Sequence, residues 1–231
     1  MDIRRRNSKG VRNVINLIKK DIAVTIGKFI AGIILIFIFA PMILLAVDIR
    51  AVYSLFIFIN LSMIMLACNT DLLVESNNNI NLLMISLPIV RKDVVKSKFI
   101  VYGMYSVLYN ILMYASVNFM CEHSFLAEIG GIQDGLGPEI ILCSLGICLI
   151  YLGIIIPLYY YSGEKSNIIG YVLFFSILGL PKLIGMLIES SIIEGIIYTN
   201  FWIAILTFIV ALIIYFTSLK ISISIYSNKE F

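Results

Sequence analysis

Charged residues are scarce in this chain. Lys, Arg, Asp and Glu make up 13% of its 231 residues, whereas 61% are hydrophobic. Soluble domains carry about 25% charged residues, so about half of the usual polar surface is missing. The mean hydropathy is +1.02, and the remaining charges lie mostly between long apolar runs. This composition excludes an ordinary soluble domain and predicts an all-α membrane protein that crosses the bilayer several times.

Catalytic and metal-binding motifs are missing as well. The chain has one histidine and four cysteines, three of them inside apolar runs, where cysteine behaves as a small hydrophobic residue. The fourth, Cys121, stands beside Glu122 and His123, but a zinc site there would need further ligands. No G-x-x-x-x-G-K-[ST], H-E-x-x-H or G-x-S-x-G motif occurs. We therefore expect no enzyme activity, no metal and no cofactor in this chain.

Basic residues are concentrated in alternate segments between the apolar runs. Fifteen of the 17 Lys and Arg residues lie in residues 1–28, 71–98 and 164–165 and in the tail from Lys220. The other two are Arg50 and Lys182. Because loops that stay in the cytoplasm are enriched in Lys and Arg, both termini are predicted to be cytoplasmic. The net charge of +3 follows this topology and gives no indication of nucleic acid binding.

Six apolar runs are candidates for membrane spans. A helix needs about 20 residues to cross about 30 Å of hydrocarbon. The runs cover residues 29–47, 51–70, 99–121, 140–163, 166–188 and 195–219. The fifth reaches this length only by continuing past Lys182. The predicted domains are a cytoplasmic amphipathic segment (1–28), a six-span transmembrane domain (29–219) and a cytoplasmic tail (220–231).

The N-terminal segment carries an apolar stripe among its basic residues. Val11, Val14, Ile15, Ile18 and Ile22 fall on one helical face. Such a helix is expected to lie in the interface of an anionic leaflet, as an elbow that leads into the first span. A cleaved signal peptide is the alternative, but the following apolar run is too long and lacks a small-residue cleavage site.

The fifth run contains a helix-breaking sequence, Gly179-Leu180-Pro181-Lys182. Proline lacks an N–H group, and irregular backbone at membrane depth must be buried or face a cavity. The sequence therefore fits a broken or re-entrant element over residues 182–196. A kinked ordinary span is the alternative, with Lys182 extending toward the headgroups or paired with Glu189.

Few polar side chains occur inside the spans. Asn60 and Asn110 are the most notable of them. Inside lipid such side chains usually bond one helix to another. Together with Lys182, the two asparagines are also the candidates for lining a translocation path.

The stretch Asp71–Lys98 is the one long polar interruption between apolar runs. Residues 76–79 can cap a helix, and Pro88 would end it. Four apolar side chains between them share one helical face: Ile80, Leu83, Met84 and Leu87. A short amphipathic helix followed by basic residues is expected to dock a partner. A solvated loop with a chance apolar stripe is the alternative.

Three short motifs carry a family resemblance. Residues 86–98 read S-L-P-I-V-R-K-D-V-V-K-S-K, residues 162–165 read S-G-E-K, and the chain ends in K-E-F. They resemble the S-L-P-[VI]-S-R-[KR]-[DE]-[IV]-V-x-x-K, F-G-x-E-K and basic-acidic-aromatic motifs of type-2 ABC exporter permeases, in particular the small bacterial six-span class. One departure is Val90, which replaces a serine and removes half of a capping box that ends at Asp93.

The resemblance implies a dimer of permeases, each held by a separate subunit that binds ATP and Mg²⁺ and hydrolyses the ATP. It identifies Ser76–Leu87 as the coupling helix, and the segment after the fifth span as re-entrant. The residues expected to contact the ATPase are Glu75, Asn79, Ile80, Leu83, Met84, Leu87, Pro88, Arg91, Lys92, Glu164 and Lys165.

Within this family the chain is most similar to permeases that export amphipathic peptides such as phenol-soluble modulins. The hypothesis is therefore the membrane permease of an ATP-driven exporter in a bacterial cell membrane. Its expected partners are an ATP-binding cassette subunit, a second permease copy in a homodimer, membrane lipid and an amphipathic peptide. The alternative is a non-transporting immunity or sensory subunit, and the missing motifs disfavour a membrane enzyme.

Overall fold

Six α-helices make up the part of the chain that the computed structural model describes, residues 2–44, 49–77, 90–123, 136–163, 165–188 and 201–228. They are α1 (Asp2–Leu44), α2 (Ile49–Asn77), α4 (Arg91–His123), α6 (Glu139–Ser162), α7 (Lys165–Ile188) and α9 (Phe201–Asn228). No β-strand occurs in these residues. Each helix contains all or most of one predicted apolar run, so the all-α prediction is confirmed.

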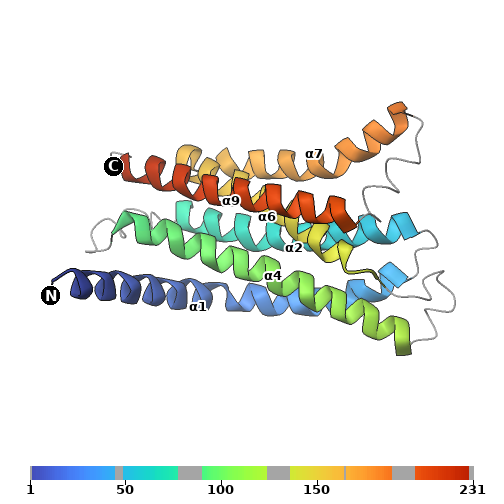
Figure 1. Cartoon of the computed structure of the whole chain (residues 1–231), viewed down its shortest axis with the longest axis horizontal. Coiled ribbons are helices and arrows are strands. Elements are labelled where there is room, and N and C mark those ends of the chain that lie inside the picture. The colour runs from blue at the N-terminus through green and yellow to red at the C-terminus, as the bar shows by residue number, and fades with distance from the viewer. Residues whose placement is uncertain are drawn as a thin grey trace.

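The helices lie side by side along the long axis of the molecule (Figure 1). Three helices each contact four others: α2 contacts α1, α4, α6 and α7, α4 contacts α1, α2, α6 and α9, and α6 contacts α2, α4, α7 and α9. The most extensive contacts are those of α6 with α9 and of α1 with α4. Successive helices alternate in direction, so both termini lie at the same end as the end of α2 and the start of α4.

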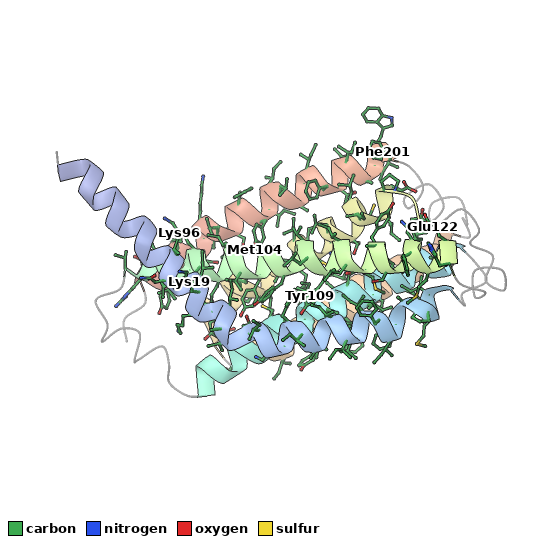
Figure 2. All side chains as sticks on the ribbon, turned by 90° about the horizontal axis from the view of Figure 1, so that it is seen from below. Lys19, Lys96, Met104, Tyr109, Glu122 and Phe201 are labelled. Carbon is green, nitrogen blue, oxygen red and sulfur yellow. The ribbon has the colours of Figure 1, made fainter. Side chains whose placement is uncertain are left out.

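Charge distinguishes this end from the other. Figure 2 shows Lys19 and Lys96 there, and Glu122 and Phe201 at the opposite end. We call it the basic end, because the starts of α1, α4 and α7 and the end of α9, which lie there, contain most of the Lys and Arg residues of the described helices. The opposite end is called the acidic end.

The local sequence explains how α6 ends. Gly163 follows its last residue with φ of 60°, a conformation that glycine adopts without steric strain. The N–H group of Gly163 donates to the carbonyl oxygen of Tyr159 at 2.9 Å and closes the last turn. The chain can therefore turn back at this point and start α7 at Lys165.

Large side chains fill the space between the helices. The largest fully buried ones include Phe56 of α2, Phe99 and Tyr109 of α4, and Tyr151 of α6. They belong to one hydrophobic core that reaches from α1 to α9. The core therefore holds the described helices together as one bundle.

The outward surface of the bundle is apolar as well. On α9, Leu206, Ile209, Ile213 and Phe216 are 48–63% exposed. Their spacing of three and four residues places them along one face of the helix. Soluble monomers rarely expose apolar patches of this extent, so this face is suited to contact lipid.

Four of the helices are long and apolar enough, within the described residues, to cross a membrane. They are Ile15–Ile43, Arg91–His123, Glu139–Ser162 and Phe201–Asn228. α2 and α7 contribute shorter apolar helices, Val52–Cys68 and Ile168–Ile177. The multi-span prediction is confirmed at this level, whereas the count of six spans and the domain boundaries at 28, 219 and 220 stay predictions.

The predicted elbow is part of a longer helix. α1 continues without a break from Asp2 to Leu44, through the expected boundary at residue 28. In Figure 2 its first part leans away from the other helices, whereas the part after Lys19 follows the bundle. Of the predicted stripe, Ile15 is exposed, and Ile18 and Ile22 pack partly buried against the core. A separate interfacial elbow is therefore not confirmed.

The helix-breaking sequence in the fifth run does not break α7. The helix passes through Pro181 and Lys182 as far as Ile188, and its ribbon changes direction toward that end in Figure 1. Proline kinks a helix by removing one backbone hydrogen bond. For residues up to 188 the backbone therefore matches the kinked-span alternative; residues 189–196 of the predicted re-entrant element lie outside the described residues.

Candidate functional site

The predicted coupling helix lies mostly outside the described residues. This applies to Asn79, Ile80, Leu83, Met84, Leu87 and Pro88, and also to Glu164. Glu75 is placed near the end of α2, which continues to Asn77. Ser76 and Asn77 therefore belong to the last turn of α2, although the sequence predicted them as the start of a separate helix. The roles of all these residues stay predictions.

The described coupling residues lie together at the basic end. Lys92 is exposed at the start of α4, and Lys165 is exposed at the start of α7. Arg91 is half-buried, and its Nη1 donates to the carbonyl oxygen of Ser227 at 3.3 Å. This bond satisfies a carbonyl at the end of α9, where helices have unpaired acceptors. The start of α4 is therefore fixed to the end of α9.

A second contact fixes α4 to α9 two turns further along. The Tyr215 hydroxyl of α9 donates to the carbonyl oxygen of Phe99 at 2.5 Å. The rings of the two residues meet edge to face with centroids 5.1 Å apart. Gly103 leaves room for this tyrosine, since a Cβ there would lie 2.9 Å from the hydroxyl oxygen. This part of α4 is therefore matched in shape to α9.

The same turns of α4 bind α1 through buried polar groups. The Ser97 hydroxyl donates to Oδ2 of Asp21 at 2.8 Å. One turn along α1, the Thr25 hydroxyl donates to the carbonyl oxygen of Asp21 at 2.8 Å and contacts the hydroxyl of Tyr105. Asp21, Thr25 and Ser97 are 8%, 4% and 1% exposed. These bonds specify how α1 docks on α4.

Sequence reasoning missed this group, although a signal was available. Leu17, Asp21 and Thr25 follow one another at intervals of four residues, and all three are buried. The predicted apolar stripe lies beside this line and includes Ile18 and Ile22. An acid that shares one helical face with a leucine and a threonine can mark a helix contact. Composition registers Asp21 only as a charge.

Lys98, the last basic residue of the polar stretch, is buried in the bundle. It is only 4% exposed. Its Nζ lies 6.0 Å from the centre of the Tyr102 ring, within the range of a cation–π interaction. Lys98 is therefore packed inside the bundle and is not part of an exposed docking surface.

The two predicted intramembrane asparagines lie inside the bundle. Asn60 is 1% exposed, and its Nδ2 donates to the carbonyl oxygen of Phe56 at 2.9 Å. Asn110 is fully buried, and its Nδ2 donates to the carbonyl oxygen of Ser106 at 2.9 Å. The side chain of Lys182, the third candidate for lining the path, lies outside the described part. Burial fits the helix-packing alternative, and a path-lining role stays a prediction.

Three buried oxygen atoms near the middle of α4 and α6 have no hydrogen-bond partner among the described residues. They are Oγ of Ser106, Oδ1 of Asn110 and Oγ of Ser144. The nearby thiol of Cys148 lies 4.0 Å from Nδ2 of Asn110. Unsatisfied buried polar groups are unfavourable. We call these residues the α4–α6 polar cluster.

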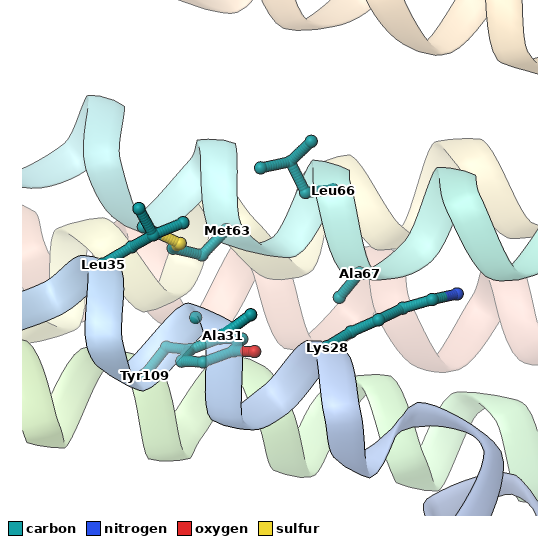
Figure 3. Close-up of a pocket in the computed structure, with 8 residues that line it drawn as sticks. Lys28, Ala31, Leu35, Met63, Leu66, Ala67 and Tyr109 are labelled. Atoms are coloured by element: carbon teal, nitrogen blue, oxygen red, sulfur yellow. The ribbon is translucent and has the colours of Figure 1, made fainter.

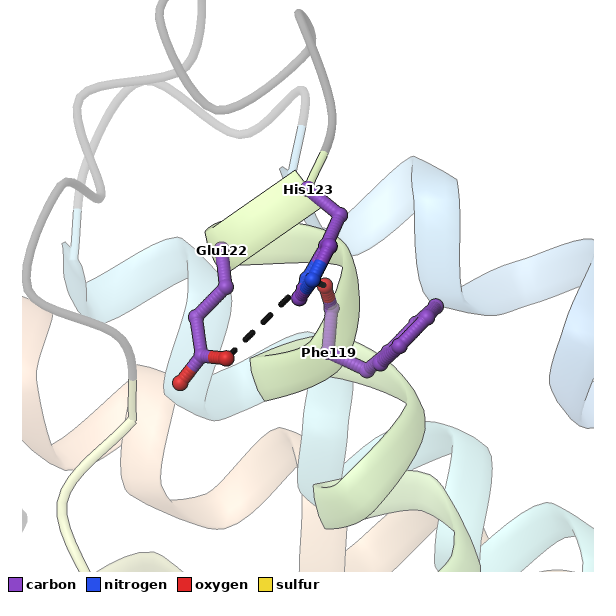
Figure 4. Close-up of polar contacts among 3 residues, drawn as sticks. All are labelled: Phe119, Glu122 and His123. Carbon is purple, nitrogen blue, oxygen red and sulfur yellow. Dashed lines mark hydrogen bonds and ion pairs between the residues drawn. The ribbon is translucent and has the colours of Figure 1, made fainter.

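Polar contacts also order the acidic end. The Tyr53 hydroxyl of α2 donates to Oε1 of Glu139 in α6 at 2.9 Å. At the end of α4, Nδ1 of His123 lies 3.1 Å from the carbonyl oxygen of Phe119 and 4.0 Å from Glu122 (Figure 4). His123 and Glu122 are both largely exposed. Their contact therefore belongs to the last turn of α4 and joins no second helix. No group of three possible metal ligands occurs within the described residues.

The comparisons with known proteins gave one finding. A family model described as "ABC-2 family transporter protein" matches residues 16–227, which include all described residues of α2, α4, α6 and α7. No curated protein matches the chain.

Proposed function

The chain belongs to the ABC-2 family of transporter proteins, and from this premise we propose that it exports amphipathic peptides from a bacterial cell. Membership makes it the membrane-embedded permease subunit of an ABC transporter, and ATP is hydrolysed by a separate ATP-binding cassette subunit. The direction of transport, the peptide cargo and the bacterial cell membrane belong to the proposal.

The observation that carries the proposal is the arrangement of the basic end. Both chain termini, the end of α2, the start of α4 and the α6–α7 turn lie there together. This end also holds most of the lysines and arginines of the described helices, as expected for the cytoplasmic side. The predicted coupling helix joins α2 to α4 at this end, where an ATPase in the cytoplasm can reach it.

The contacts of α4 suggest how ATPase motion would spread. A movement of the coupling helix would act first on the start of α4, since the chain enters that helix at Arg91. From there it would reach α9 through Arg91 and Tyr215, and α1 through Ser97. We therefore place α4 as the element that distributes the movement to both sides of the bundle.

The proposed cargo follows from the largely apolar interior of the described helices. The buried Asn60 and Asn110 do not line a channel in the described part of the bundle. Two copies would therefore form the pathway between them. Largely apolar walls can hold the apolar face of an amphipathic peptide without strong hydrogen-bonding traps.

The test is capture of the ATPase by permease variants. Leu83→Asp or Met84→Asp would place a carboxyl group in the apolar groove of the partner, which costs several kcal/mol if it stays unpaired. We expect the cassette subunit to be lost from the purified complex while membrane insertion is kept. His123→Asp, at the exposed acidic end, is the matched control and should retain the subunit.

Further measurements separate the exporter from the alternatives. In the intact complex an amphipathic peptide should raise the rate of ATP hydrolysis, whereas a scrambled peptide without an apolar face should not. Full recovery of the cassette subunit with both variants would refute the coupling-helix assignment. Failure of any cassette subunit to co-purify with the wild-type chain would refute the exporter and favour a non-transporting subunit.

A further inference from the structure

A half-open pocket of about 190 Å³ lies between α1, α2 and α4. Its walls are apolar, formed by Ala31 and Leu35 of α1 and by Met63, Leu66 and Ala67 of α2, and Tyr109 of α4 closes its floor. Figure 3 shows the side chain of Lys28 running beside Ala67 at one edge of the pocket. The pocket thus combines an apolar interior with a cation at its edge.

Gly32 leaves the space in which the Tyr109 ring forms the floor of the pocket. A Cβ at this position would lie 2.6 Å from the hydroxyl oxygen of Tyr109. Only a glycine therefore lets the Tyr109 ring come so close to α1 without displacement. The ring separates the pocket from the interior of the bundle, so the pocket opens away from the core.

The surface of α1 combines apolar residues with lysines, as the pocket does. Lys20, Val24, Lys28, Ala31 and Leu35 succeed one another at intervals of three and four residues, which places them along one stripe of the helix. Lys20, Val24 and Lys28 occupy the part of the stripe toward the basic end, and Lys28, Ala31 and Leu35 line the pocket. At about 1.5 Å per residue, Lys28 lies about 10 Å along the axis from Leu35.

We propose that this pocket binds an acyl chain of an anionic phospholipid, whose phosphate lies at Lys28. An acyl chain matches the apolar walls, and an anionic headgroup complements Lys28 and the exposed Lys20 on the same stripe. The site faces the inner leaflet if the basic end is cytoplasmic, and this part of the assignment rests on the proposed function. The bound lipid would hold α1 against α2 at this pocket.

Fluorescence quenching by brominated lipids tests the site. Trp202 is the only tryptophan of the chain, so Trp202→Phe provides a silent background. A reporter tryptophan is then introduced at the rim of the pocket by Leu66→Trp, or on the lipid-facing surface of α9 by Ile213→Trp. The full-length protein is reconstituted into vesicles that contain phosphatidylcholine and phosphatidylglycerol, with bromine on the acyl chains of one lipid at a time.

The expected result is a preference confined to the pocket. The Leu66→Trp reporter should show at least about fivefold preference for phosphatidylglycerol, the factor that one lysine near an anionic surface provides. The Ile213→Trp reporter should show none. Lys28→Gln should remove about fivefold of the preference, whereas Lys28→Arg and the control Lys220→Gln should keep it.

Three outcomes would overturn the proposal. They are equal preference at both reporters, no effect of Lys28→Gln in protein that is correctly folded by size-exclusion chromatography, and selective displacement of lipid from the Leu66→Trp reporter by an uncharged amphipathic Leu/Gln peptide. The last outcome would assign the pocket to cargo. Because the vesicles contain both lipids in both leaflets and need no ATPase, a failed lipid test leaves the exporter intact, and a failed capture test leaves the lipid site intact.

Discussion

Single side chains determine how α1 is held, and the bond between Ser97 and Asp21 is the clearest example. Ser97 donates to a carboxyl group that is only 8% exposed. A buried acceptor that loses its donor is costly, because water cannot replace the lost bond. The hydroxyl of Ser97 therefore contributes to the position of α1, together with the contact of Thr25 with Tyr105.

We predict that Ser97→Ala lowers the stability of the protein by about 1–2 kcal/mol. Hydrogen bonds to charged groups contribute about 1.5–3 kcal/mol in proteins, and bonds between membrane helices contribute about 0.6 kcal/mol on average. The apparent Tm of the purified protein should fall by several degrees. Ser176→Ala is the control, because Ser176 bonds only to its own helix, at the carbonyl oxygen of Val172. Equal Tm values for the two variants would contradict the role of the bond.

At the scale of helices, α6 and α9 form the closest pair. Gly146 and Gly153 of α6 lie one heptad apart, and a Cβ on Gly153 would lie 3.3 Å from Cγ2 of Ile214 and 3.7 Å from Cα of Tyr215. On α9, Ala204, Ala211 and Ser218 repeat at the same interval and are 0%, 0% and 4% exposed. Small residues on both helices let the two backbones approach closely.

We predict that Gly153→Leu separates this pair and lowers the apparent Tm. Overpacking a core typically costs about 1–3 kcal/mol, and the bond from the Ser218 hydroxyl to the carbonyl oxygen of Gly153, 2.5 Å long, would be stretched. Gly27→Leu is the matched control, since nothing lies within 4 Å of a Cβ at that glycine. Thermal unfolding of both variants decides the question, and an unchanged Tm for Gly153→Leu would refute the close seam.

The sequence predicted the helices better than their partners. Long apolar runs and the shortage of charge were enough to predict an all-α membrane protein. The ends were less predictable, because α2 and α4 continue beyond their apolar runs into the polar stretch, to Asn77 and from Arg91. Which helices pack against each other was not predicted, because hydropathy carries no information on how Gly153 and Gly103 fit the shape of α9. The role of Asp21 was not predicted, because composition does not distinguish a buried carboxyl group in a helix contact from a solvated one.

At the scale of the whole molecule, the described bundle presents apolar faces that its own core does not cover. In the most apolar window of α1 only 17% of the residues are buried, against 61% for α6. On α7, Val172 and Phe175 are 59% and 68% exposed. Lipid or a second copy of the chain can cover such faces. The resemblance to type-2 ABC exporter permeases implies that the first and fifth spans, α1 and α7, face the second copy.

We predict disulfide cross-links between copies through these two helices. The four native cysteines are first replaced, and single cysteines are introduced by Phe37→Cys in α1, by Phe175→Cys in α7 or, as a control, by Ile213→Cys in α9. Covalent dimers are expected for the first two variants in membranes that contain the whole transporter, and not for the control. Cross-links confined to α9 would refute the proposed seam, and a monomeric permease in the active complex would refute a pathway between two copies.

The α4–α6 polar cluster has a consequence for the energy landscape of this bundle. A contact in which every polar group is satisfied has one deep energy minimum. At Ser106, Asn110 and Ser144 three oxygen atoms lack partners among the described residues, so this contact is locally frustrated. The cross-helix hydrogen bond of the cluster, from Nδ2 of Asn110 to the Cys148 thiol, is long at 4.0 Å, so a small shift of α4 against α6 costs little at this point. We therefore expect the middle of the α4–α6 contact to readjust during the transport cycle, while Arg91 and Tyr215 keep α4 joined to α9.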